Sequence, residues 1–242
     1  MRCVRNPSEG AFPPGGRDTF LKQYVTPRNW PRPRVYADRS TAFGTCALVI
    51  IKRTNDNPQM LLNIRGDEMA ETPNLSHVAP AGTFQPNHPD DYFHEREFSL
   101  ESNLIREFVE ELLDEKSLRS NPPASDCTSY EKMFSAKGKR FLEVVTNKQR
   151  YCLLYLGTIV DPLNLKPEAV TVFLIHEGYL EQVTDGVLTP TWETKRFGLK
   201  EFTMQEIDRL IRERHHFVPT GVAHLTMVKK HFNSISRWLA RV

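Results

Sequence analysis

Short apolar blocks alternate with polar turns along the middle of the chain, and their spacing predicts strands mixed with helices. Residues 99–117 carry apolar side chains at helical spacing, and Ser99 can cap the start of that helix. Apolar, β-branched runs bounded by turn residues predict strands at 45–52, 59–65, 76–81, 140–145, 150–160, 169–175 and 192–197. Such a mixture indicates an α/β domain with helices on both faces of a sheet.

The C-terminal segment predicts two further helices. Thr203 and Glu206 form a capping-box pattern ahead of apolar residues at helical spacing. Thr220 is expected to cap a last helix that runs to about Leu239. The basic segment 137–140 lacks the first glycine and the hydroxyl residue of a phosphate-binding loop, so we interpret it as the connection of a hairpin.

Residues 1–40 differ from the rest because prolines are concentrated there among arginines. Proline removes a backbone donor and fixes φ, so this segment is predicted to be an extended arm. We expect disorder before residue 18, and we expect residues 18–40 to wrap the domain using Phe20, Tyr24 and Trp30. Residues 41–242 then form the folded domain, which is long enough for one well-formed core.

Composition and charge exclude several functional classes. The 242 residues include 32 basic and 30 acidic ones, and this net charge of +2 gives no electrostatic reason to bind nucleic acid or an anionic membrane. The longest apolar runs, 46–51 and 151–156, are too short to cross a bilayer, and no signal peptide is visible. The four cysteines form no C-x-x-C pair, so we expect a reducing cytoplasm, with Cys46 and Cys152 buried in strands.

The chemically most informative segment is 106–111, which reads R-E-F-V-E-E. In a helix, the carboxylates of Glu107, Glu110 and Glu111 fall on one face. Like charges at this spacing destabilise a bare helix by about 0.2–0.5 kcal/mol per pair, and a hard divalent cation would remove that cost. The alternative is an acidic helix face that is exposed to solvent and paired with basic neighbours.

This segment resembles the box of the Nudix hydrolase family, in which an opening glycine precedes a helix carrying R-E-U-x-E-E, where U is a bulky aliphatic residue. Gly82, within the run P-A-G-T-F at 80–84, matches the opening glycine, and Phe108 takes the aliphatic position. Segments 65–68 and 73–78 are also similar to the family's approach to the box. The resemblance therefore covers roughly residues 42–235.

The sequence departs from the family pattern in three places. The R-E-x-x-E-E helix begins about ten residues later than the spacing of the box requires. Leu113 and Asp114 stand where the box has a glycine and an aliphatic residue. Phe98 stands where the box has its first glutamate. Among the glutamates at 95, 97 and 101, Glu101 is the preferred supporting carboxylate because it shares the helix register.

The resemblance implies an α/β/α sandwich with a mixed central sheet, and hydrolysis of a nucleoside diphosphate linked to another moiety. The three helix glutamates would hold Mg²⁺ or Mn²⁺, which prefer oxygen ligands, and Glu110 and Glu111 would be catalytic together with Arg106. Arg106 would fork onto a neighbouring carboxylate. The backbone of Ala81 and Gly82 would come close to the metal or the phosphate.

The resemblance leaves several roles open. The general base would be a glutamate on a distant loop, with Glu181 and Glu193 as candidates. Phe84 and Trp192 could stack on a base or ribose, or could belong to the core. Two copies of the chain could pair, as family members often do. The chain could instead be a catalytically weak or inactive module that senses a nucleotide or nucleotide sugar and regulates another protein.

Two histidine-containing segments could bind a metal ion. The inserted loop at 88–95 holds two histidines and three acidic residues, but their spacing matches no known metal site. A polar surface loop, or a lid over the substrate, is expected there. His215 and His216 are expected near a helix end, where their positive charge would suit the helix dipole.

Overall fold

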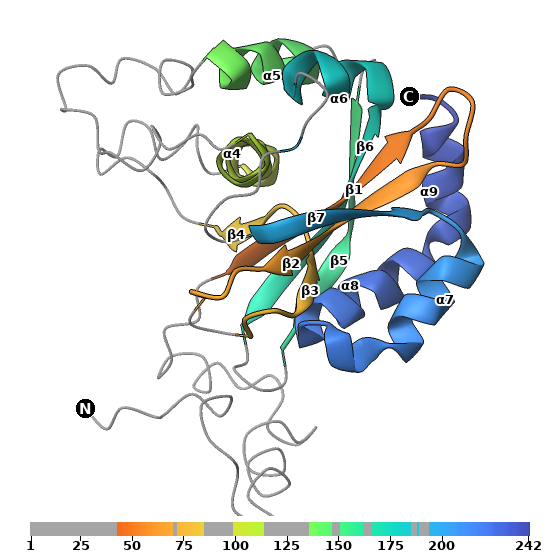
Figure 1. Ribbon diagram of the computed structural model, residues 1–242. Coiled ribbons are helices and arrows are strands. Elements are labelled where there is room, and N and C mark those ends of the chain that lie inside the picture. The colour runs from red at the N-terminus through yellow and green to blue at the C-terminus, as the bar shows by residue number, and fades with distance from the viewer. Residues whose placement is uncertain are drawn as a thin grey trace, which may run out of the picture.

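The computed structural model describes residues 43–69, 72–84, 99–113, 136–146, 151–161, 166–184, 188 and 194–242. The predicted N-terminal arm and the histidine-containing inserted loop lie outside these ranges, as do Trp192 and Glu193. Within the ranges, the chain forms a sheet with helices packed on both sides (Figure 1).

The described strands form one mixed sheet of seven strands. They are β1 Gly44–Lys52, β2 Gln59–Arg65, β3 Ser76–Val78, β4 Ala81–Thr83, β5 Tyr151–Val160, β6 Pro167–His176 and β7 Thr194–Glu201. The order across the sheet is β3-β2-β1-β6-β5, with β4 paired to β1 and β7 paired to β2. Strands β1 and β6 are parallel, and the other pairs are antiparallel.

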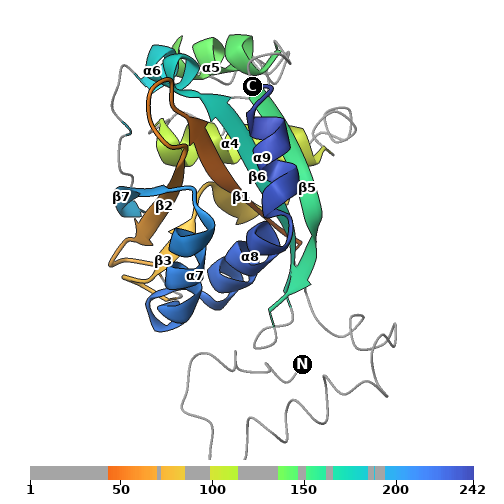
Figure 2. The same cartoon turned by 90° about the vertical axis from the view of Figure 1, so that its right-hand side faces the viewer.

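Helices cover both faces of this sheet. One layer contains α4 Leu100–Leu112, α5 Ala136–Thr146 and α6 Glu177–Thr184, and the other contains α7 Met204–Arg212, α8 Pro219–Lys230 and α9 Phe232–Leu239. Figures 1 and 2 show the two layers on opposite sides of the strands. The predicted α/β/α sandwich with a mixed sheet is confirmed. None of the helices in these ranges has both the length and the apolar composition of a membrane span.

Strand β1 shows how the sequence produces this layering. The residues at 47, 49 and 51 pack with α4, α5 and α6, whereas those at 46, 48 and 50 pack with α7, α8 and α9. Successive side chains on a strand point to opposite faces, and both faces are covered here. An uninterrupted apolar run is therefore what this central strand requires.

Aromatic rings join α4 and α5 to the sheet. Phe108 of α4 stacks on Phe141 of α5 with centroids 4.2 Å apart and an interplanar angle of 10°. Both rings also contact Phe173 of β6, at 5.5 and 6.0 Å, and Tyr151 of β5 stacks on Phe173 at 5.2 Å. Such pairs contribute about 0.5–1.5 kcal/mol each beyond their buried area, so this cluster holds α4 firmly in place.

Two of the predicted helix starts are confirmed. The Ser99 hydroxyl accepts a hydrogen bond from the Ser102 amide at 3.4 Å, so Ser99 caps α4. Thr203 caps α7 in the same way, accepting from the amide of Glu206 at 3.2 Å. The Glu206 carboxylate pairs with Arg209, at 2.6 Å between Oε1 and Nη2. A capping side chain is worth about 1 kcal/mol, so these two helices begin where their own sequence dictates.

The strand predicted at 140–145 is wrong, because these residues belong to helix α5. Phe141, Val144 and Val145 recur at i, i+3 and i+4 and are buried in the core together with apolar residues of α4 and the sheet. The valines favour a strand by propensity, but packing against the sheet decides the conformation. The segment 137–140, interpreted as a hairpin connection, is instead part of the same helix.

The end of the chain also differs from the prediction. Val218 is the N-cap of α8 and Pro219 its first residue, so Thr220 lies inside the helix and does not cap it. His231 separates α8 from α9, so the predicted single helix is two. Likewise the strand predicted at 76–81 is two strands, because β3 pairs with β2 whereas β4 pairs with β1.

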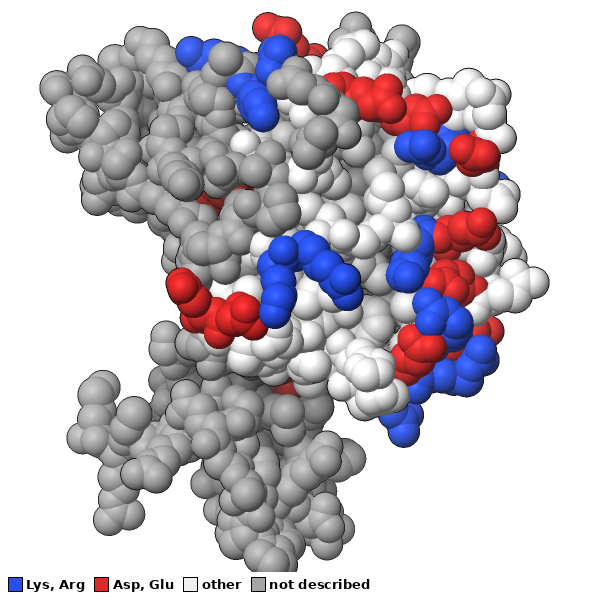
Figure 3. All heavy atoms as spheres, in the orientation of Figure 1, with Lys and Arg blue, Asp and Glu red and all other residues white. Residues whose placement is uncertain are grey.

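Figure 3 shows basic and acidic side chains interspersed on the described surface.

Candidate active site

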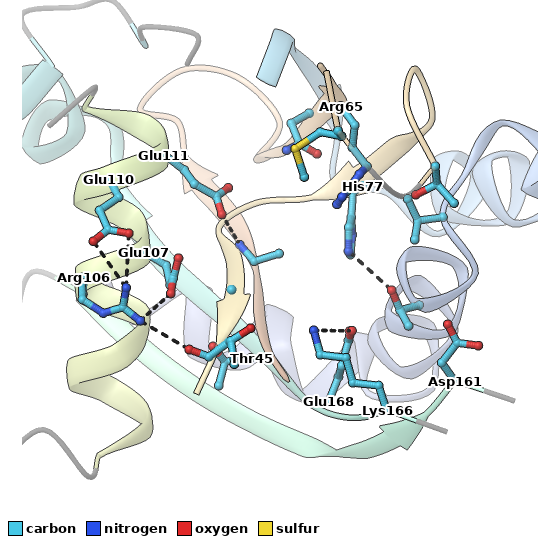
Figure 4. Close-up of a pocket in the computed structure, with 18 residues that line it drawn as sticks. Thr45, Arg65, His77, Arg106, Glu107, Glu110, Glu111, Asp161, Lys166 and Glu168 are labelled. Carbon is cyan, nitrogen blue, oxygen red and sulfur yellow. Dashed lines mark hydrogen bonds and ion pairs between the residues drawn. The ribbon is translucent and has the colours of Figure 1, made fainter. Parts of the chain in front are cut away.

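A pocket of about 360 Å³ opens at one end of the sheet, between α4, the strands β1 to β4, and the starts of β6 and α8 (Figure 4). Charged side chains line it: the carboxylates are Glu107, Glu110, Glu111, Asp161 and Glu168, and the cations are Arg65, Arg106 and Lys166. Among the described lining residues, carboxylates thus outnumber cations by five to three. An excess of carboxylates among these residues is the kind of lining that suits a bound cation.

Helix α4 forms the acidic wall of this pocket. Its aromatic and aliphatic side chains, Phe108 and Leu112 among them, are buried in the core and fix the rotation of the helix. Glu107, Glu110 and Glu111 lie on the adjacent face of the helix and line the pocket together. Their spacing predicted that they would share one face. Glu107 and Glu111 are only 7% and 5% exposed, whereas the Glu110 side chain is more open.

Arg106 holds two of these carboxylates. Its Nη2 lies 2.6 Å from Oε1 of Glu107, and its Nη1 lies 3.2 Å from Oε2 of Glu110. Nη2 also donates to the carbonyl of Thr83 at 3.4 Å. The planar guanidinium therefore joins the acidic helix face to strand β4, and the buried charges are paired rather than isolated.

Strand β4 approaches the acidic wall with its backbone. The amide of Ala81 donates to Oε1 of Glu111 at 3.0 Å. At Gly82, a Cβ atom would lie 2.0–2.3 Å from the carboxyl atoms of Glu107. Only a residue without a side chain leaves room for that carboxylate beside the strand. The structure thus brings Ala81 and Gly82 to the same pocket as Arg106 and the three glutamates.

Asn103 fixes α4 relative to the strands behind it. Its Oδ1 accepts a short hydrogen bond from the Thr45 hydroxyl of β1, and its Nδ2 donates to the carbonyl of Thr83 in β4 at 3.2 Å. Asn103 and Thr45 are nearly completely buried. These bonds satisfy polar groups that would otherwise be costly inside the protein, and they set the distance between helix and strand.

We expect Gly82→Ala to displace the Glu107 carboxylate and to lower any metal-dependent activity by about as much as Glu107→Gln does, roughly 100-fold. The far end of a glutamate can move, so the free energy of unfolding should fall by no more than about 1–3 kcal/mol. Gly198→Ala on β7 is the matched control, because a Cβ there meets nothing within 4 Å. Chemical denaturation and kinetics test both variants, and full activity in Gly82→Ala would refute this role of the glycine.

A second group of charged residues lies across the pocket and was not found from the sequence. Glu168 is the second residue of β6, and Lys166 immediately precedes that strand. The distance between Nζ of Lys166 and Oε1 of Glu168 is 3.9 Å. Burial, chiefly, raises the pKa of Glu168, while Lys166 lowers it and Asp161 raises it further. Figure 4 shows these residues on the side of the pocket away from α4.

The neighbouring strand makes room for Glu168 as β4 does for Glu107. Gly44 of β1 is the direct partner of Glu168 in the parallel β1–β6 pair. A Cβ at Gly44 would lie 2.6 Å from Cγ of Glu168. Glycines on adjacent strands therefore back one glutamate on each side of the pocket. The sequence signal for this group was weak, because it depends on which distant strands pair.

Two histidines are buried in this half of the molecule. Nδ1 of His77 accepts from the Val78 amide at 2.8 Å, and burial followed by Arg65 lowers the pKa of His77 to about 3. Nε2 of His224 lies 2.8 Å from the carbonyl of Thr171, and burial lowers the pKa of His224 to about 4. Both imidazoles are therefore neutral at physiological pH.

These histidines predict acid-sensitive stability. Their folded-state pKa values lie below the ordinary value of 6.5, so stability is fully present above pH 6.5 and is lost as pH falls towards 4. A shift of this size at His224 corresponds to roughly 3 kcal/mol. We expect urea unfolding between pH 7 and pH 4 to show this fall, and His224→Gln to make the pH dependence shallower. An unchanged slope in the variant would contradict the assignment.

Several predicted site residues lie elsewhere. The Tyr151 hydroxyl donates a short hydrogen bond to Glu101, which is not part of the described pocket lining. Glu181 is exposed on α6, away from the pocket, so it is not placed to act as a base there. Phe84 makes an edge contact with Phe43 at 5.9 Å. His215 and His216 form a 3₁₀ turn after α7.

The described residues contain no group of three or more His, Cys, Asp or Glu side chains arranged as a preformed metal site. The three helix glutamates have protein partners instead, namely Arg106 for two of them and the Ala81 amide for the third. Cys46 is completely buried, as expected, whereas Cys152 is only partly buried. Burial, first of all, raises the pKa of the Cys46 thiol.

Comparison with known proteins gives matches at the level of structure. No model of a known protein family matches the sequence, and no curated protein does. Among solved structures, a Nudix hydrolase from Alicyclobacillus acidocaldarius is 14% identical over 78% of this chain and 91% of that one, with a TM-score of 0.45. A mutT/nudix family protein from Listeria innocua is 15% identical over 83% and 98%, with a TM-score of 0.43.

The Nudix domain of NrtR from Shewanella oneidensis, solved in complex with ADP-ribose, is also similar. It is 11% identical over 87% of this chain and 97% of that one, with a TM-score of 0.41. All three of these structures are described as Nudix proteins.

Proposed function

We propose that this protein is a divalent-metal-dependent hydrolase that cleaves the pyrophosphate bond of a nucleoside diphosphate linked to another moiety. The observation that carries the proposal is the excess of carboxylates among the described residues that line one pocket, three of them on a single turn of α4. Buried carboxylates in excess of cations are costly unless a further cation joins them. Lys166 in the same lining suits the negative charge of a diphosphate.

The residues of α4 and β4 fit Mg²⁺ or Mn²⁺. Glu107, Glu110 and Glu111 offer the carboxylate oxygens that these ions prefer, and Gly82 leaves the space at the Glu107 carboxylate that any side chain would fill. Arg106 holds the carboxylates at this end of the pocket and neutralises part of their charge. When bound, the ion would neutralise charge on the diphosphate and lower the pKa of an attacking water.

Glu168 is our candidate for the general base. It faces the pocket from the side opposite α4, and it replaces Glu181, which the sequence suggested. Burial raises the pKa of Glu168, and a carboxylate whose pKa approaches the working pH is a more effective proton acceptor. Lys166 lies close enough to hold the deprotonated form in place. Glu168 would then take the proton of the attacking water.

One observation favours a second function. Arg106 is paired with two of the three helix glutamates, and no metal cage is preformed among the described residues. A pocket in which arginine takes the place of the metal could bind a nucleotide or nucleotide sugar without cleaving it. The protein would then be a sensing module that regulates another protein.

The cytoplasmic location and the pairing of two copies stay predictions.

A substrate panel separates the two functions. Purified protein is incubated with ADP-ribose, NADH, dinucleoside polyphosphates and nucleoside triphosphates, first with Mg²⁺ and then with Mn²⁺, and the products are resolved by chromatography. Metal-dependent release of a nucleoside monophosphate supports the hydrolase. Saturable binding of a panel member without turnover supports the sensor. If no compound is bound or cleaved, both functions are refuted for these substrate classes.

A further inference from the structure

Strand β2 contributes two unused polar atoms to the pocket. Asn63 and Arg65 are two positions apart, so their side chains share a face of the sheet, and both line the pocket. Oδ1 of Asn63 and Nε of Arg65 are buried, and neither has a hydrogen-bond partner within the described part of the chain. Asn63 is only 5% exposed. One atom is an acceptor and the other a donor.

An unpaired amide oxygen at this place needs an explanation. Leaving a buried polar group unsatisfied costs a protein about 1–3 kcal/mol, whereas an apolar side chain of the same shape would cost nothing. On this strand face Leu61 precedes Asn63 and Arg65 follows it, and the strand partners of Asn63 are Phe197 on β7 and His77 on β3. Nδ2 of Asn63 donates to the Thr194 hydroxyl at 3.3 Å, which directs the amide and leaves its oxygen without a partner among the described residues. These are the properties of a side chain kept for a ligand.

The position within the pocket indicates which part of a ligand it meets. Figure 4 shows Arg65 and His77 across the pocket from Glu107 and Glu110. The proposed function places the diphosphate at the glutamates, so Arg65 and His77 face the part of the ligand beyond it. Met69 lines the same pocket, and a thioether packs well on a flat ring. A nucleobase presents a donor and an acceptor side by side on its edge, which complements the acceptor of Asn63 and the donor of Arg65.

We propose that Asn63 and Arg65 bind the hydrogen-bonding edge of the substrate's nucleobase. This subsite rests on the proposed function, because the acidic end of the pocket is assigned to the diphosphate. Asn63 accepts from an exocyclic amino or ring N–H group, and Arg65 donates to the neighbouring ring nitrogen or carbonyl oxygen. His77 is neutral and leaves no extra positive charge beside the base. Asn63 therefore determines specificity and takes no part in bond cleavage.

The test uses α,β-methylene analogues of ADP, GDP, CDP and UDP, with methylenediphosphonate as the probe that lacks a base. None can be cleaved at the bridge, so binding measured by calorimetry with Mg²⁺ does not depend on hydrolysis. We expect wild type to bind at least one nucleotide analogue more tightly than methylenediphosphonate. Asn63→Leu should weaken that nucleotide by about tenfold and leave methylenediphosphonate unchanged. Asn63→Asp, which keeps an acceptor, should retain most of the preference.

The stability of the free protein gives a second readout. Asn63→Leu removes a buried amide oxygen that has no partner among the described residues, at the cost of the long bond to Thr194, so we expect its Tm to rise by about 2–4 °C. Asn233→Leu on α9, an exposed position, is the matched control and should change neither property. A lower Tm in Asn63→Leu would make Asn63 a structural residue and overturn the subsite.

Three binding results would also overturn it. The first is equal affinity of wild type for methylenediphosphonate and all four nucleotides. The second is an unchanged nucleotide preference in Asn63→Leu. The third is an effect of Asn63→Leu that disappears when the ligand is the 2′,3′-dideoxy form, which would place Asn63 at the ribose. If the subsite fails while the substrate panel still shows metal-dependent cleavage, the proposed function stands without it. If the preference is confirmed without any cleavage, the sensor function stands.

Discussion

Glu168→Gln is expected to lower kcat by about 10²- to 10⁴-fold, the usual contribution of a general base. The amide keeps the shape of the side chain beside Gly44 but cannot accept a proton from water. Burial raises the pKa of Glu168, so the wild-type rate should rise as pH increases through that raised value, above the ordinary 4.5. The residual rate of the variant should lack this rise. Steady-state kinetics between pH 4.5 and pH 8 measures both effects.

A structural defect would not explain such a loss. Because the pKa of Glu168 is raised in the folded state, the stabilisation linked to its protonation is present at low pH and is lost as pH rises through the folded pKa. Glu168→Gln should therefore be at least as stable as wild type at pH 7. Glu143→Gln, an exposed position on α5, is the matched control. Full activity in Glu168→Gln, or an unchanged pH profile, would remove Glu168 from the reaction.

Glu110→Gln and Glu111→Gln are each expected to lower kcat/KM by about 10²- to 10³-fold. A metal ion contributes several kcal/mol to transition-state stabilisation, and each 1.4 kcal/mol is a factor of ten. Glu110→Gln also loses its ion pair with Arg106, and Glu111→Gln weakens the bond from the Ala81 amide. When the rate is measured against the Mn²⁺ concentration, each variant should need more Mn²⁺ than wild type to reach half of its maximal rate.

The same variants can be tested without a substrate. A metal that binds only the folded protein raises Tm with its concentration, by RT ln(1 + [L]/Kd) in free energy. We expect Mn²⁺ at about a hundred times its dissociation constant for wild type to stabilise wild type by about 2.7 kcal/mol, and both variants by much less. Glu143→Gln should respond as wild type does. Equal metal stabilisation of all four proteins would show that the ion binds elsewhere.

The acidic wall of the pocket could be predicted because its information is local. Glu107, Glu110 and Glu111 lie within one helical turn, and the apolar residues between them fix which way that turn faces. The Ser99 cap shows that the start of this helix is also encoded nearby. The α/β/α sandwich followed from the alternation of strand and helix patterns in the same way.

The opposite wall could not be predicted because its information is long-range. Glu168 reaches the pocket only because β6 pairs in parallel with β1. No pattern in the residues between these two strands predicts that pairing. The sequence marks Asn63 only as a polar residue in a strand, and the fold is needed to show that its oxygen is buried without a hydrogen-bond partner in the described part of the chain. Tertiary packing likewise overrode the strand propensity of Val144 and Val145, which are helical in α5.

The position of the metal tests the account most directly. A crystal of the protein soaked with Mn²⁺ and an α,β-methylene nucleotide can be measured at an X-ray energy where manganese scatters anomalously. We predict an anomalous peak bounded by the carboxylates of Glu107, Glu110 and Glu111 and the backbone at Gly82, with the diphosphate beside it. A crystal that holds the nucleotide but shows no such peak, with Arg106 still bridging Glu107 and Glu110, would contradict a metal-dependent hydrolase.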